Sequence, residues 1–131
     1  MNMQSTVIKA IDEASLNRGL SGANWLSDRR NIACVSENGD VTLFDYEGDK
    51  DYQIHVIFKS RGRAAIQSAR ESIQTMFDIH GADLIFGLVP DFRRDVKLLA
   101  RWVGMKSAGI RMTDEGPCEL FVLSAPMKRV N

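Results

Sequence analysis

The sequence contains little cysteine, histidine or proline: two, two and three residues respectively among 131. Cys34 and Cys118 are far apart, and each is flanked by apolar residues. They lack the closely spaced cysteine or histidine partners that a zinc site requires, and His55 and His80 are likewise isolated. We therefore expect two buried thiols and no metal site.

The sequence also lacks an excess of charge and a long apolar run. Its 17 basic and 17 acidic side chains give a formal net charge of zero. Domains that bind nucleic acid usually carry a basic excess, and anionic membranes attract basic surfaces, so neither is an expected partner. The segment Met1 to Ala10 has no continuous apolar stretch, which predicts no secretory signal, no membrane span and a cytoplasmic location.

The first half of the sequence predicts two helices followed by antiparallel strands. Aliphatic residues recur at helical spacing in the opening segment, and Gly19 follows where that helix should end. Asn38-Gly39 is a strong signal for a tight hairpin, and alternating apolar residues mark a third strand. The expected helices are Thr6–Arg18 and a short one within Ser21–Arg30, and the expected strands are Ile32–Val35, Val41–Phe44 and Tyr52–Lys59.

The second half predicts a strand between two helices and then a closing hairpin. After Gly62 the apolar residues return to helical spacing until His80-Gly81. The next run is apolar almost without interruption, which is typical of a strand covered on both faces and parallel to a neighbour. A further helix stops at Gly104. The expected strands are Leu84–Val89, Lys106–Met112 and Cys118–Ser124, and the expected last helix contains Phe92, Val96, Leu99, Ala100 and Val103 on one face.

This order of elements predicts a single α/β domain over residues 1–131. Its expected architecture is a central mixed sheet flanked by helices, with one right-handed parallel crossover in the middle. The last strand, Leu120–Leu123, is interpreted as core. The alternative is an exposed edge that pairs between the subunits of a homodimer.

The segment from Val56 to Ile66 is the strongest indication of a ligand, because a strand runs through a short turn of small residues directly into a helix. The N–H groups of a first helical turn have no internal acceptor, and the helix dipole adds partial positive charge, which suits a phosphate or pyrophosphate group. Arg61 and Arg63 would add charge. The alternative is an arginine-flanked helix start that binds nothing.

From Tyr52 to Ile110 the sequence resembles the core of the GNAT superfamily of N-acetyltransferases, on a strand, the turn Arg61-Gly62-Arg63-Ala64-Ala65, a long helix, an apolar strand and a helix ending Trp102-Val103-Gly104-Met105. In that family an Arg/Gln-x-x-Gly-x-Gly/Ala turn binds the pyrophosphate of coenzyme A, and Lys59-Ser60-Arg61-Gly62-Arg63-Ala64 fits it with lysine in first place. The resemblance implies the GNAT fold, acetyl-CoA as cosubstrate and an amine as acceptor. The cofactor-binding residues that it implies are Ile57, Phe58, Lys59, Arg61, Gly62, Arg63, Ala64 and Ala65.

The family's catalytic groups are only partly present. The reaction needs a base for the amine proton, and His55 is the candidate because it lies on the strand where the family often carries one. Asp51 and Glu47 are further candidates. The tyrosine that protonates the departing thiolate in many members corresponds to Ala100, and an asparagine earlier in that helix corresponds to about Arg93. Both departures argue against turnover.

Two functions therefore stay open from the sequence. The first is an acyl-CoA-dependent N-acyltransferase acting on an unidentified amine. The second is a catalytically inactive accessory protein, because Ile54 to Gly104 looks closest to short GNAT-like proteins of tailed bacteriophages, some of which are described as head-assembly proteins. A phage structural protein would then be the partner and the host cytoplasm the location. The basic row Arg94, Lys97 and Arg101 is interpreted as meeting the coenzyme's ribose phosphate, an acidic partner or solvent alone.

Overall fold

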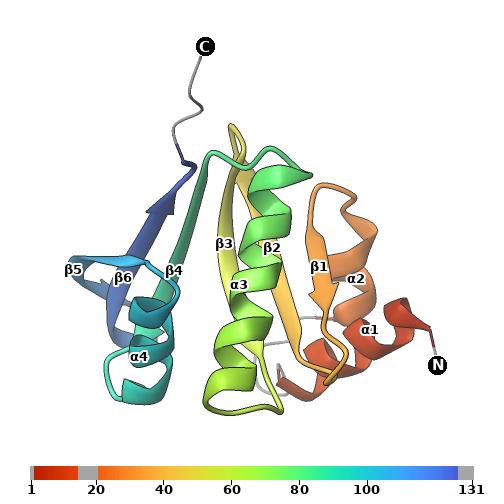
Figure 1. Ribbon diagram of the computed structural model, residues 1–131, viewed down its shortest axis with the longest axis horizontal. Helices are drawn as coiled ribbons and strands as arrows, with labels where there is room; N and C mark the ends of the chain where they lie inside the picture. Colours follow the sequence, from red (N-terminus) through yellow and green to blue (C-terminus); the bar gives the residue numbers. More distant parts are fainter. Residues whose placement is uncertain (1, 15–20, 127–131) are drawn as a thin grey trace.

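The computed structural model describes residues 2–14 and 21–126, which form the helices and strands labelled in Figure 1. The predicted end of the first helix, at Arg18 and Gly19, lies outside the described residues. In chain order the elements are α1 (Met3–Ala14), α2 (Gly22–Ser27), β1 (Ile32–Val35), β2 (Val41–Gly48), β3 (Asp51–Ile57), α3 (Arg63–Asp78), β4 (Leu84–Pro90), α4 (Arg94–Trp102), β5 (Lys106–Thr113) and β6 (Gly116–Ser124).

The described strands form one mixed sheet in the order β1-β2-β3-β4-β6-β5. Neighbouring strands in it are antiparallel except for β3 and β4, which are parallel and joined through α3. The predicted α/β class and mixed sheet are confirmed. The hairpin signal at Asn38-Gly39 is confirmed as well, since it lies between β1 and β2 and Gly39 has a φ of 82°.

Helices cover both faces of the sheet (Figure 1). On β2, Leu43 belongs to a cluster formed with α1 and α2, whereas Phe44 belongs to a larger cluster formed with α3 and α4. Successive side chains of a strand point to opposite faces, so these clusters lie on opposite sides of the sheet. The run Val41 to Phe44 is buried throughout because both of its faces are covered. No described helix has the length and apolar character needed to cross a membrane.

The predicted strand Leu84–Val89 and its parallel pairing with a neighbour are confirmed, but its burial was overstated. β4 is parallel to β3, as expected, but it is antiparallel to β6 on its other side. Its burial also alternates: Ile85, Gly87 and Val89 face the helices and are buried, whereas the residues between them are half-buried. α1 and α2 pack on the other half of the sheet, so an apolar run alone overstates how completely this strand is covered.

The alternative that the last strand forms a sheet edge is wrong. β6 pairs with β4 on one side and with β5 on the other, so the edge strand at this end of the sheet is β5. β5 is exposed along almost its whole length, and Ile110 and Met112 are among its exposed residues. The hairpin places the earlier strand outside because the later one has the apolar residues, such as Phe121, that fit under α4.

Asp40 is the polar anchor between the β1–β2 turn and the segment that leads into α3. Its side chain is 1% exposed. One carboxylate oxygen accepts the backbone N–H groups of Lys59 at 2.7 Å and Ser60 at 2.9 Å, and the other accepts the hydroxyl of Ser68 at 2.8 Å. Burial works to raise the pKa of Asp40, but these hydrogen bonds outweigh it, and the pKa lies below its ordinary value.

We predict that Asp40→Ala lowers the free energy of unfolding by about 3 kcal/mol, because three donors lose an ionised acceptor in a buried place. Because the pKa of Asp40 is lowered in the folded state, its contribution to the free energy of unfolding should be fully present above the ordinary carboxyl pKa. It should be lost as the pH falls through the lowered pKa. Urea unfolding between pH 7 and pH 3, beside the exposed control Glu37→Ala, measures both effects. If the loss of unfolding free energy in Asp40→Ala stayed the same at pH 3 as at pH 7, the ionised carboxylate would not be the stabilising group.

Candidate active site

β3 and β4 separate soon after they meet, and the described structure has a pocket between them. The recorded pairs join Asp51–Gln53 to Leu84–Phe86, although both strands continue beyond them. Figure 1 shows the two strands meeting at one end and diverging toward the end where α3 and α4 begin. A pocket of about 470 Å³ is lined by the later residues of both strands, by α3 and α4, and by the β5–β6 turn.

The pocket reaches both faces of the sheet. Ile54 and Val56 lie on the face covered by α3, whose Ala69 and Ile73 complete an apolar wall. Gln53 and His55 point to the opposite face, because side chains alternate along β3, and they line the pocket too. The arrangement offers an apolar passage on one face and polar groups on the other.

Gly87 lies at the narrow end of the pocket. A Cβ atom at this position would lie 3.2 Å from Cγ2 of Ile54 across the gap, which is tighter than ordinary van der Waals contact. Any larger side chain would therefore push on β3 where the two strands part. The glycine allows the close approach that shapes this end of the pocket.

His55 is held by an acidic neighbour that sequence reasoning missed. Its Nε2 lies 2.9 Å from Oδ2 of Asp45 on β2, and the two side chains are 39% and 28% exposed. Asp45 also accepts a hydrogen bond from the indole N–H of Trp25. Burial works to raise the pKa of Asp45, but the bonds from His55 and Trp25 outweigh it and leave the pKa below its ordinary value. The predicted antiparallel pairing of the two strands could have placed Asp45 near His55. It could not have predicted that the two side chains are in contact.

The other two candidate bases are not at the pocket. Asp51 begins β3 at the end where it pairs with β4, and Glu47 is exposed near the end of β2. The pocket lining includes neither of them. Of the three candidates, His55 alone combines a strand position with access to the pocket.

The predicted anion-binding turn continues directly from the pocket wall. Val56 lines the pocket and the turn follows it, while Ala65 lies one helical turn before Ala69 on the same face of α3. None of the eight predicted cofactor-binding residues lines the pocket itself. The turn instead connects two of its walls, and Arg61 through Ala64 are exposed.

Gly62 sets the geometry of this turn. It is the N-cap residue of α3, with a φ of 61° and a ψ of −134°, and no side chain caps the helix. The first backbone bond recorded for the helix runs from the N–H of Ile66 to the C=O of Gly62, which leaves the preceding N–H groups for other acceptors. Within the described residues Arg61 and Arg63 form no ion pair. The turn thus offers donors and positive charge to an anion.

The pocket contains no phenol where the resemblance places one. Ala100 lines the pocket from α4, and Arg93 lines it too but forms a two-bond contact with Asp95. Those bonds lower the pKa of Asp95 to about 2. Cys118 is a buried thiol at the same pocket, as expected, whereas Cys34 is only half-buried. No group of side chains suited to hold a metal ion occurs among residues 2–14 and 21–126.

The basic row on α4 mostly forms ion pairs with acidic side chains of the same chain. Lys97 lies 3.0 Å from one oxygen of Glu119 and also pairs with Asp91, and Arg101 lies 3.3 Å from the other oxygen of Glu119. Hydrogen bonds from Ser107 and Lys97 lower the pKa of Glu119. The row therefore fixes α4 to β6, and only Arg94 stays exposed without such a contact among the described residues.

Comparison with known proteins shows the fold. No family model and no curated protein sequence matches the chain. A spermidine N-acetyltransferase chimera of Vibrio cholerae SpeG and hSSAT superposes with a TM-score of 0.74 at 11% identity, over 95% of this chain and 92% of that one. A GNAT-family acetyltransferase from Bacillus anthracis gives 0.62 at 11% identity, over 93% and 86%.

A third structure, AAC(6')-Ib in complex with ribostamycin and coenzyme A, gives a TM-score of 0.62 at 14% identity. The match covers 76% of this chain and spans 66% of that protein's length. These likenesses confirm that the chain has the GNAT acyltransferase fold. They do not show closeness to phage proteins.

We predict that Gly62→Ala lowers the free energy of unfolding by about 1–3 kcal/mol, because its backbone conformation is nearly restricted to glycine. Space is not the cause, since nothing lies within 4 Å of the added Cβ. Ala64→Gly, two positions along, is the matched control and should cost no more than about 1 kcal/mol. Equal losses measured by thermal unfolding would show that the Gly62 conformation carries no strain for alanine.

Proposed function

We propose that this protein transfers an acetyl group from acetyl-CoA to an amine. The observation that carries the proposal is the pocket between β3 and β4. The turn before the uncapped N-terminus of α3 connects two of its walls, at Val56 and Ala69, and the pocket lining includes His55. The proposal also agrees with the GNAT fold and with coenzyme A in one of the matched structures. A cytoplasmic location is part of the proposal.

The turn before α3 would hold the pyrophosphate of the coenzyme. Its free N–H groups and the charges of Arg61 and Arg63 are suited to such an anion. Asp40 keeps the preceding backbone in place through Lys59 and Ser60. The proposed binding segment is the predicted one, Ile57 to Ala65, and its side chains Phe58 and Lys59 border the same turn.

The open edge of β3 would align the thioester. Beyond Gln53 this edge is no longer paired with β4, so alternate backbone N–H groups are directed to the pocket. Such a group can stabilise the oxyanion that forms when the amine nitrogen attacks the thioester carbon. The apolar wall of Ile54, Val56 and Ile73 excludes water from one side of the reacting atoms.

His55 would take the proton that the attacking amine loses. When the carbon–sulfur bond breaks, the thiolate leaves and takes up one proton. Ala100 offers no donor for that proton, so solvent in the open pocket is its source in our proposal. Loss of a general acid slows such a reaction without abolishing it, which reconciles the missing phenol with turnover.

The alternative proposal is a catalytically inactive binding protein, including a head-assembly protein of a phage. It rests on the missing phenol, and no contact in the described structure favours a protein partner. In a homodimer, the exposed edge of β5 would be the pairing surface for a second copy of the chain.

We predict saturable binding of acetyl-CoA in a calorimetric titration, with the affinity of Arg61→Ala/Arg63→Ala reduced roughly tenfold, or by about 1.4 kcal/mol. Arg29→Ala removes an exposed arginine that precedes β1, whereas the turn that Asp40 joins to the binding segment follows β1. This variant should leave the affinity unchanged. The absence of binding by wild type at millimolar acetyl-CoA would favour the inactive binding protein.

We predict that His55→Gln lowers kcat roughly 10²- to 10⁴-fold, because it removes the base, and leaves acetyl-CoA binding intact. The assay measures thiol release from acetyl-CoA with a panel of primary amines and polyamines. His80→Gln changes an exposed histidine outside the pocket and serves as the control. Equal rates for wild type and His55→Gln on an accepted amine would remove His55 from the mechanism.

A further inference from the structure

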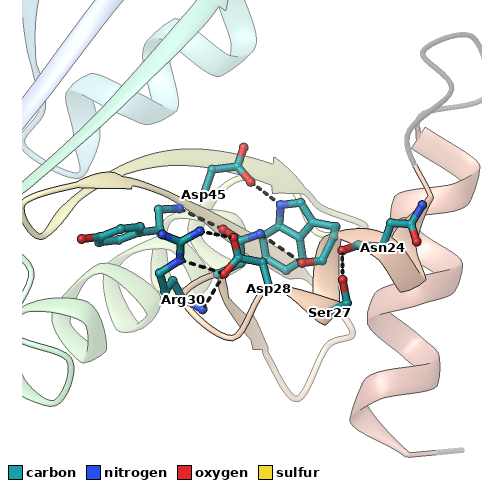
Figure 2. A network of polar contacts seen from close by, with 8 residues as sticks. Asn24, Ser27, Asp28, Arg30 and Asp45 are labelled. Carbon is teal, nitrogen blue, oxygen red and sulfur yellow. Dashed lines mark hydrogen bonds and ion pairs between the residues drawn. The ribbon is translucent and has the colours of Figure 1, made fainter.

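The carboxylate of Asp45 is fixed at both of its oxygens. Oδ2 contacts Nε2 of His55 at 2.9 Å, and Oδ1 accepts the indole N–H of Trp25. The two partners come from different elements, β3 and α2, and Asp45 itself lies on β2. Figure 2 draws the indole bond to the labelled Asp45 as a dashed line.

The indole of Trp25 is itself held in place. It is 6% exposed, and it packs with Val7, Ile11 and Leu43 in the cluster under α1. The side chain of Asn31 donates to the backbone C=O of Trp25 at 3.0 Å and accepts the backbone N–H of Tyr46 at 3.0 Å. This bridge ties the end of α2 to the strand that carries Asp45, so the indole and the carboxylate cannot easily move apart.

The ionisation of Asp45 decides which way the contact with His55 runs. The carboxyl pKa is lowered, as described above, and an ionised carboxylate has no proton to donate. The contact at 2.9 Å therefore requires a hydrogen on Nε2 of His55. In the neutral ring, Nδ1 then carries the lone pair.

We propose that Asp45 is a positioning residue that fixes His55 in the tautomer with hydrogen on Nε2, and so leaves Nδ1 as the atom that accepts the proton of the acceptor amine. This inference rests on the proposed function for its last part. On proton uptake the imidazolium lies beside the same carboxylate, which stabilises the charge as it forms. Asp45 does not itself take the proton.

The first test is nitrogen NMR of the whole protein labelled with ¹⁵N-histidine, at a pH where the ring is neutral. The chemical shifts of the two ring nitrogens identify the tautomer, and His55→Gln assigns the signals. Wild type should show hydrogen on Nε2. Asp45→Asn should lose this preference. The indole N–H of Trp25 can only donate and so keeps the amide oxygen, which leaves the amide NH2, a donor without a lone pair, facing Nε2 of His55.

Asp28→Asn is the matched control. Asp28 is ion-paired with Arg30 in the same region, does not contact His55, and its change should leave the tautomer as in wild type. Thermal unfolding shows whether each variant is folded. A wild-type ring with hydrogen on Nδ1, or an unchanged ring in folded Asp45→Asn, would overturn the proposal without the need for any activity.

The second test is kinetic. Asp45→Asn should lower kcat by roughly 10- to 10⁴-fold with little change in the KM for acetyl-CoA, the upper value being the cost of the same change in Ser-His-Asp enzymes. If wild type transfers no acetyl group to any amine, the proposed function fails, while the NMR result still decides the role of Asp45. If wild type is active and Asp45→Asn is equally fast, the positioning role fails alone.

Discussion

The separation of β3 from β4 is the constraint on which the rest of the site depends. Each strand keeps its register with its other neighbour, β2 or β6, after the two have parted. Side chains from both faces of the sheet therefore line one pocket, and the inner strand edges retain backbone groups that need partners from solvent or a ligand. In our proposal, the amide groups of the acyl-CoA substrate supply such partners.

Three acidic residues hold the surroundings of that pocket in place. Asp40 fixes the backbone before α3, Glu119 fixes α4 through Lys97 and Arg101, and Asp45 fixes His55. Each is stabilised as an ion by hydrogen bonds, and its pKa lies below the ordinary value. Among the described residues no buried side-chain nitrogen or oxygen lacks a hydrogen-bond partner. Apolar packing therefore forms the walls of the pocket, and the polar groups fix the positions of the elements around it.

The local patterns of the chain predicted most of the elements. Alternation, the Asn38-Gly39 hairpin and the stripe containing Ala69, Ile73 and Met76 each arise from neighbours in sequence, and the structure has the corresponding strands and helix. The prediction that β4 is covered on both faces overstated its burial, because burial there depends on which helices pack on which half of the sheet. The idea of β6 as an edge was wrong as well: β5, the other strand of the hairpin, takes the edge, and this order depends on which strand packs under α4.

The sequence by itself determined the α/β class and the strand–turn–helix around Gly62, since these follow from spacing and residue type. His55 became a candidate base only through the resemblance to the GNAT superfamily. Only the tertiary structure decided that β3 and β4 part after three residue pairs, that Asp51 and Glu47 lie away from the pocket, and that Asp45 contacts His55. These features join residues on different elements. Their distances depend on strand register and on how helices pack, which no stretch of sequence encodes locally.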